Sequence, residues 1–111
     1  MHHAGLRVLA GTDHPIAVMI PGASLHEELA LLVRAGLKTA EALRAGTLSP
    51  AEYLGMADSL GTTADGKLAE LMLLDANPLD DIRSVSRVQA VWRGGRYLDR
   101  RTLDEMLARL R

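Results

Sequence analysis

A β-hairpin near the C-terminus constrains the fold of this chain more than any other feature. Residues 88–93 (VQAVWR) have the β-branched and aromatic content of a strand. Gly94-Gly95 is a pair that suits a two-residue hairpin turn, and residues 96–98 begin the returning strand. Trp92 and Tyr97 flank the turn, and we expect them to pack against each other across the sheet.

Two further apolar runs are predicted to be strands. Residues 6–10 (LRVLA) are mostly apolar and are followed by Gly11, which is typical of a short buried strand. Residues 67–75 (KLAELMLLD) form a longer run, and its flanking turn residues favour a strand even though Leu, Met and Ala are better helix formers. With the hairpin, these runs predict about four short strands.

Capping signals predict helices in the rest of the chain. Ser24 and Glu27 have the spacing of a capping box, which predicts a helix that ends at Gly36. A second helix is expected over residues 39–45. A third should begin at residues 49–52, which supply an N-cap and a proline, and end at about residue 56. A last helix should run from the capping box at 102–105 to the C-terminus. The chain is therefore predicted to be α/β, in an α+β arrangement with four to five helices. No linker or repeat divides it, which predicts a single domain over residues 1–111.

Composition narrows the possible partners. The 111 residues carry a net charge of −1 with no long run of one sign, so we expect no nucleic-acid and no membrane partner. The sequence has no cysteine, which excludes thiolate metal sites and favours the cytoplasm. Hydrophobic residues make up 48% of the chain although it has no Phe and one Trp, which hints at surface buried in an oligomer. A small-molecule substrate or a protein partner is expected.

The order of these segments resembles the C-terminal part of metal-dependent amidohydrolases. The likeness rests on "AGLRVLAGTDHP", "SLHEELALLVRAGLKTAEALRAGTLSPAEYLGMADSLGTTADGKLAELMLLDANPLDDI" and "VQAVWRGGRYLDR", which together cover roughly residues 4–100. The imidazolonepropionase-like and prolidase-like members are the most similar. Two departures are mild, since Glu70 stands where the family usually has Asp and Gly46 where it usually has Ala.

The resemblance implies the end of a (β/α)8 barrel and part of a small β-sandwich. Residues 4–60 would be the eighth barrel strand and the helices after it, 61–100 the sandwich-derived hairpin region, and 101–111 a C-terminal helix. By the same resemblance Asp13 would be the acid at the end of the eighth strand, where it binds the metal and takes a proton from the attacking water. The family's other ligands come from earlier strands and have no counterpart here. We therefore expect exposed strand edges and apolar faces to be completed by oligomerisation.

Five residues are candidates for a divalent-metal site, with zinc as the first expectation from the ligand types: Asp13, His26, His14, His2 and His3. A strand between His3 and Asp13 would span about 20 Å. His2 and His3 could then reach only the Asp13 side chain of another copy of the chain. Each candidate also has a structural interpretation: Asp13 as a turn residue, His14 as a loop residue, His26 as a structural histidine, and His2 and His3 as remnants of a surface helix.

The leading hypothesis is a truncated amidohydrolase-like hydrolase with Asp13 as its catalytic residue. Water would attack an amide, ester or phosphoester at a metal site that is assembled in a homo-oligomer. Two alternatives remain open. The chain could be a non-catalytic, self-associating remnant, or it could be the C-terminal subunit of a split amidohydrolase whose other ligands are encoded separately.

Overall fold

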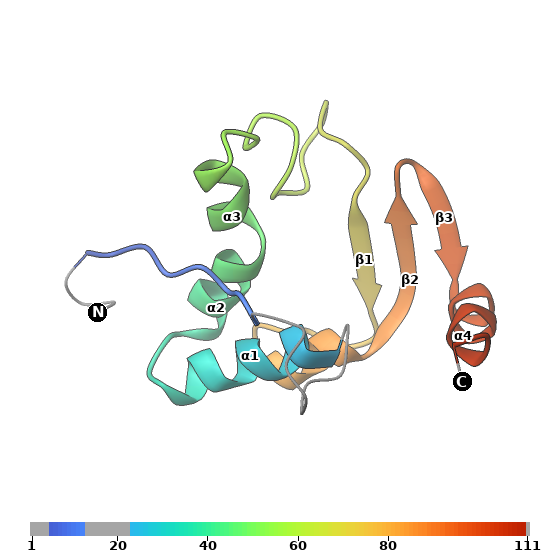
Figure 1. Ribbon diagram of the computed structural model, residues 1–111, viewed down its shortest axis with the longest axis horizontal. Helices are drawn as coiled ribbons and strands as arrows, with labels where there is room; N and C mark the ends of the chain where they lie inside the picture. Colours follow the sequence, from blue (N-terminus) through green and yellow to red (C-terminus); the bar gives the residue numbers. More distant parts are fainter. Residues whose placement is uncertain (1–4, 13–22, 111) are drawn as a thin grey trace.

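This computed structural model describes residues 5–12 and 23–110 (Figure 1). These residues contain three antiparallel strands and four α-helices. The helices are α1 (Ala23–Arg34), α2 (Thr39–Gly46), α3 (Leu48–Tyr53) and α4 (Arg100–Ala108). The strands are β1 (Leu71–Leu74), β2 (Val88–Arg93) and β3 (Arg96–Asp99), and η2 (Ile82–Ser86) is a 3-10 helix. The sheet order is β1-β2-β3, so β1 and β3 are its edges.

The predicted hairpin is confirmed. Gly94 and Gly95 have φ angles of 58° and 77°, values that let a two-residue turn follow the twist of the strands. Trp92 is paired with Tyr97, and their ring centroids lie 4.9 Å apart at 48°. Glu70, the residue before β1, supports the turn, because its Oε1 accepts a hydrogen bond from Gly94 N at 2.8 Å.

The strand predicted over residues 67–75 is shorter in the structure. Only Leu71–Leu74 belong to β1, with an irregularity in the pairing between Leu73 and Leu74. The start of the run is held by the preceding loop: Leu68 N donates to Ser59 O at 2.9 Å, and Lys67 N donates to Ala64 O at 3.3 Å. These local bonds take the place of strand pairing, so the length of the apolar run overestimates the length of the strand.

The prediction of a strand over residues 6–10 is wrong in this structure. Residues 6–12 form neither helix nor strand, and Figure 1 shows them as a drawn-out segment beside α2. Ala10 N donates to Ala45 O at 2.9 Å, but within the described ranges no strand lies alongside the segment. A strand requires a neighbour that satisfies its backbone groups, and the apolar pattern cannot supply one. The count of four strands is corrected to three for the described residues.

The helices are confirmed, but several of their predicted caps are not. Ser24 and Ser49 are buried inside the first turns of α1 and α3, which each begin one residue before the expected cap. Helix α4 begins at Arg100 because Asp99 accepts a hydrogen bond from Thr102 N, so Thr102 is not the cap. The longest described helix, α1, has 12 residues, and no described helix is long and apolar enough to cross a membrane.

The buried core is small and lies among the helices. Leu29, Ala42, Ile82 and Val85 form it, from α1, α2 and η2. The chain exposes 8244 Å², whereas a compact monomer of 12.0 kDa exposes about 6,000 Å². Its radius of gyration of 14.7 Å also exceeds the value of about 13 Å expected for 111 residues. Many large apolar side chains are exposed, among them Leu31, Leu54 and Leu68.

The cap of α4 gives a pH-dependent prediction. The hydrogen bond from the Thr102 backbone holds the pKa of the Asp99 carboxyl below its ordinary value of 3.8. Because the folded helix favours the charged form, the cap stabilises α4 above that ordinary pKa and is lost as the pH falls through the lower pKa of the folded state. We expect Asp99→Ala to reduce the hydrogen-exchange protection of the Thr102 amide at neutral pH.

Asp99→Asn is the matched control, because it keeps an oxygen acceptor without a titrating group. It should retain the protection of the Thr102 amide from neutral pH down to acid. Unchanged protection in Asp99→Ala would show that this bond does not cap the helix.

The loop glycines give a stability prediction. Gly61 has a φ of +99°, and a Cβ added there would lie 3.0 Å from both Leu48 Cα and Ala51 Cβ. Gly66 has a φ of +84° but open space around it. We expect Gly61→Ala to lower the free energy of unfolding by about 2–4 kcal/mol in urea titrations, and Gly66→Ala by about 1 kcal/mol, because only the first adds a steric clash to the backbone strain. Equal losses would contradict the predicted contact.

Candidate active site

Four of the five candidate ligands lie outside the described residues. Asp13, His14, His2 and His3 fall in residues 1–4 and 13–22, so their positions stay predictions. His26 is described, and it lies half-buried in the first turn of α1. The structure therefore places one candidate and tests none of the expected contacts between them.

The described residues do not by themselves fit a metal ion. Within residues 5–12 and 23–110, no three His, Asp or Glu side chains gather closely enough to hold one. A catalytic zinc site usually has three protein ligands and one open position. His26 would need companions from the undescribed segments or from another chain, so we derive no reaction step through a metal from the described side chains.

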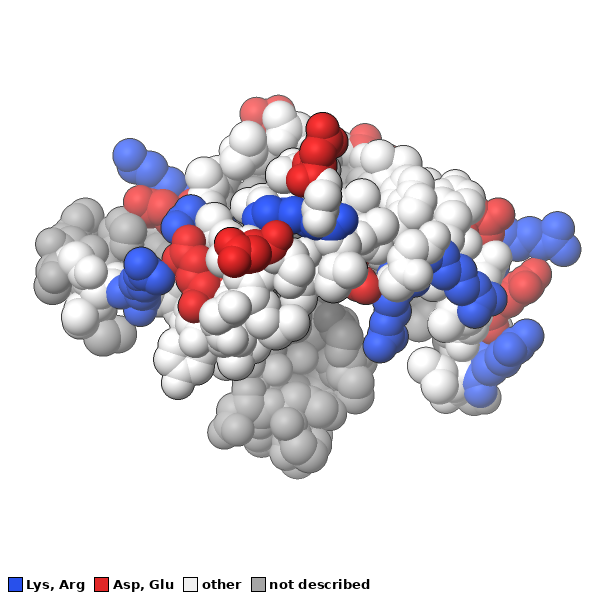
Figure 2. Space-filling view, turned by 90° about the horizontal axis from the view of Figure 1, so that it is seen from above, with Lys and Arg blue, Asp and Glu red and all other residues white. Residues whose placement is uncertain are grey.

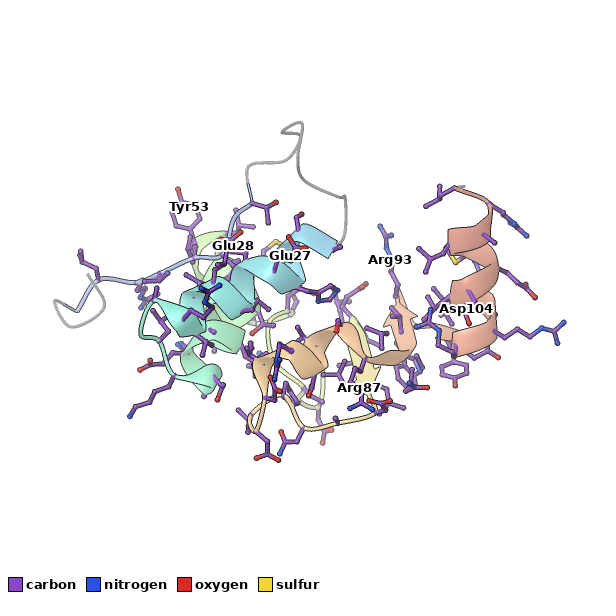
Figure 3. The ribbon with its side chains drawn as sticks, turned by 90° about the horizontal axis from the view of Figure 1, so that it is seen from below. Glu27, Glu28, Tyr53, Arg87, Arg93 and Asp104 are labelled. Atoms are coloured by element: carbon purple, nitrogen blue, oxygen red, sulfur yellow. The ribbon has the colours of Figure 1, made fainter. Side chains whose placement is uncertain are left out.

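Glu28 fixes the segment that leads to Asp13. Its Oε1 accepts a hydrogen bond of 2.6 Å from Gly11 N, two residues before Asp13. Figure 3 shows Glu28 on the side of α1 along which this segment runs. Since successive helical residues turn by about 100°, Glu28 and His26 point to roughly opposite sides of α1. The hydrogen bond between Glu28 and Gly11 therefore fixes the path of the segment before Asp13, but it does not bring this segment close to His26.

Glu52 provides a second anchor, which the sequence did not indicate. Its position three residues after Ser49 is typical of a capping-box acid, but its oxygens instead accept from Arg7 Nη1 and Arg44 Nη2, each at 2.8 Å. Arg7 and Glu52 are 45 residues apart in the chain, so no local pattern could reveal the pair. Glu28 and Gly11 are 17 residues apart, so no local pattern could reveal their contact either.

The carboxyls with perturbed pKa values have structural roles. Hydrogen bonds from the Arg83 side chain and backbone lower the pKa of Asp81, which caps η2. Asp99 caps α4 in the same way. Both carboxyls are exposed and belong to helix starts rather than to a cleft, so they do not indicate a catalytic centre.

A hollow in the described part of the chain runs beside β1. We call it the β1 groove; it has a volume of about 700 Å³ and is lined mainly by apolar side chains, among them Leu60, Leu68, Leu71, Met72, Leu73 and Trp92. The charged residues at its wall are Glu70, which already bonds to Gly94 N, and Arg93. No described histidine lines it. Its chemistry suits an apolar contact rather than catalysis.

Charge is spread thinly over the surface. Figure 2 shows Lys and Arg side chains interspersed with Asp and Glu on the face in view, with broad uncharged areas between them. Half of the described ion pairs join two exposed side chains, such as Arg101 with Glu105 on α4. Such pairs contribute little to stability. The described face therefore offers uncharged rather than strongly charged surface to a partner.

The chain is similar to amidohydrolases over most of its length. The profile of the amidohydrolase family matches residues 1–98. An N-substituted formamide deformylase from Arthrobacter pascens is 33% identical over 88 residues, which cover 72% of this chain and 16% of that protein. An ochratoxinase from Aspergillus niger is 33% identical over 98 residues, which cover 84% of this chain and 19% of that one.

Solved structures give the same result. A prolidase-like protein from Bifidobacterium longum superposes with a TM-score of 0.81 at 36% identity, over 97% of this chain and 28% of that one. A Xaa-Pro dipeptidase with bound methionine in its active site superposes with a TM-score of 0.79 at 28% identity, over 88% of this chain and 23% of that one. The chain spans less than a third of each relative. The resemblance seen in the sequence is confirmed, and the chain belongs to the amidohydrolase family.

Proposed function

We propose that this chain is part of a hydrolase that acts on an amide-type small-molecule substrate. The observation that carries the proposal is the family match over residues 1–98, which includes the segment around Asp13. Relatives named as a deformylase, an ochratoxinase and a Xaa-Pro dipeptidase support this class of reaction. Within this proposal, the bond that is cleaved is an amide in the first place, and an ester or a phosphoester is the alternative.

Asp13 is the residue of this chain that we assign to the reaction. Its carboxylate accepts a proton from the attacking water, and the Glu28 contact to Gly11 N at 2.6 Å holds the chain two residues before it. A divalent metal, with zinc first, supplies acidified water in hydrolases of this kind. Asp13, His26, His14, His2 and His3 are the proposed ligands. The described residues alone do not form such a group, so the proposal requires ligands from the other segments or from another copy.

Metal content tests this assignment separately from activity. Untagged protein should bind divalent metal in a fixed ratio by elemental analysis, and Asp13→Asn should lose most of it. Turnover of a dipeptide ending in proline or of an N-formyl amine should fall by at least a hundredfold in the same variant, since general acid–base groups contribute about 10²–10⁴-fold. Asp65→Asn, which changes an exposed loop carboxyl, is the control and should keep both properties.

We also propose that the chain acts as a homo-oligomer. Exposed apolar side chains at the sheet edge, such as Met72 and Leu73, support the proposal. Light scattering over a hundredfold dilution should show an assembly that dissociates at low concentration. A single monomeric species throughout would contradict self-association.

The second candidate is a non-catalytic, self-associating protein, which is an alternative that the sequence leaves open. Oligomers without bound metal and without turnover would support this candidate. Metal binding that appears only when a separately encoded chain with a His-x-His motif is added would instead support a split amidohydrolase.

A further inference from the structure

Two helices hold the backbone just before Asp13. Ala10 N donates to Ala45 O of α2 at 2.9 Å, and Gly11 N donates to Glu28 Oε1 of α1 at 2.6 Å. Figure 1 shows the segment drawn out at this point, and successive amides of an extended chain point to opposite sides. The two bonds therefore fix two consecutive residues to two different helices.

The second of these bonds acts on a glycine. Gly11 has no Cβ, and a Cβ added there would meet no other atom within 4 Å, so packing does little to restrict its φ and ψ angles. Asp13 follows two residues later, and its Cα can lie no more than about 7.6 Å from that of Gly11. The Glu28 bond therefore limits backbone freedom at a point from which the position of Asp13 is set.

Helix α1 gives this bond a rigid origin. Leu29, the next residue after Glu28, is 6% exposed and belongs to the buried core that joins α1, α2 and η2. A hydrogen bond from an amide to a carboxylate is charge-assisted and about twice as strong as one between neutral groups. The bond thus connects the core of the protein to the backbone before Asp13.

The Glu28 carboxylate has no other described role. Among residues 5–12 and 23–110, Gly11 is its one hydrogen-bond partner, and no described lysine or arginine forms an ion pair with it. It differs in this from Glu52, which binds two arginine side chains. The contact of Glu28 is therefore directed at the backbone of the segment alone.

We propose that Glu28 is a positioning residue for the reaction, which acts by holding Gly11 and thereby sets the place of the Asp13 carboxylate. The inference rests on the proposed function, in which Asp13 accepts a proton from the attacking water. A displacement of about 1 Å at a reacting group can reduce a rate by about a hundredfold. Glu28 therefore affects the chemical step more than it affects substrate binding.

Steady-state kinetics of Glu28→Ala test the proposal with a dipeptide ending in proline or an N-formyl amine. We expect kcat to fall by about ten- to hundredfold. KM should change by less than about threefold, because the variant displaces a group that acts in the transition state and leaves the substrate contacts in place. Glu28→Gln keeps an oxygen acceptor at the same reach, so it should keep at least about a third of the wild-type kcat.

Glu27→Ala is the matched control. Glu27 is the same residue type on the same helix, is exposed, and has no hydrogen bond to any described residue (Figure 3). Its removal should leave kcat and KM unchanged. Kinetics are measured below the unfolding midpoint of each variant, so that lost turnover does not reflect unfolded protein.

Hydrogen exchange at the Gly11 amide tests the bond without using activity. Glu28→Ala should accelerate this exchange at least about tenfold, because the amide loses its acceptor. Glu28→Gln and Glu27→Ala should change it by less than about threefold. Neither result depends on bound metal or on turnover.

Each contrary outcome overturns the inference in a distinguishable way. Unchanged exchange in Glu28→Ala shows that the bond does not hold the segment. Faster exchange with an unchanged kcat shows that the bond holds Gly11 but does not position Asp13. A rise in KM alone assigns Glu28 to substrate binding. A wild-type protein without turnover overturns the proposed function and with it the role of Glu28 in the reaction, whereas an active wild type and an equally active Glu28→Ala overturn this inference alone.

Discussion

Backbone hydrogen bonding at the edges of the sheet is the constraint on which the rest of this structure depends. Three strands satisfy each other through the β1–β2 and β2–β3 ladders, but the outer side of β1 has no described partner. Residues 6–10 have a strand-like sequence, but none of the described strands pairs with them. An unpaired edge favours association with another chain.

The position of the core follows from this incomplete sheet. Leu29, Ala42, Ile82 and Val85 bury one another among α1, α2 and η2, while the sheet is joined to this cluster mainly through the short contact of β1 with η2. Helix α4 packs on β2 and β3 at the far end (Figure 1). Such an arrangement gives an extended molecule in which one end holds the core and the other end presents exposed side chains.

The candidate site depends on contacts that join distant parts of the chain. Glu28 holds Gly11, and Glu52 holds Arg7 and Arg44, so two carboxylates of the helical region position the segment that leads to Asp13. In the proposed function these carboxylates support Asp13 rather than act in the reaction. The metal ligands remain a prediction, because the described part of the chain brings no three of them together.

The sequence by itself determined the local elements and the family. Gly94-Gly95 specifies its turn through positive φ angles, and the helical periodicities placed α1 and α2 within one or two residues. Tertiary structure decided the rest: whether residues 6–10 pair, where β1 begins, and which carboxylates anchor the segment before Asp13. The physical reason is that a turn or helix satisfies its hydrogen bonds within a few residues, whereas a strand or an ion pair needs partners that lie far away in the chain.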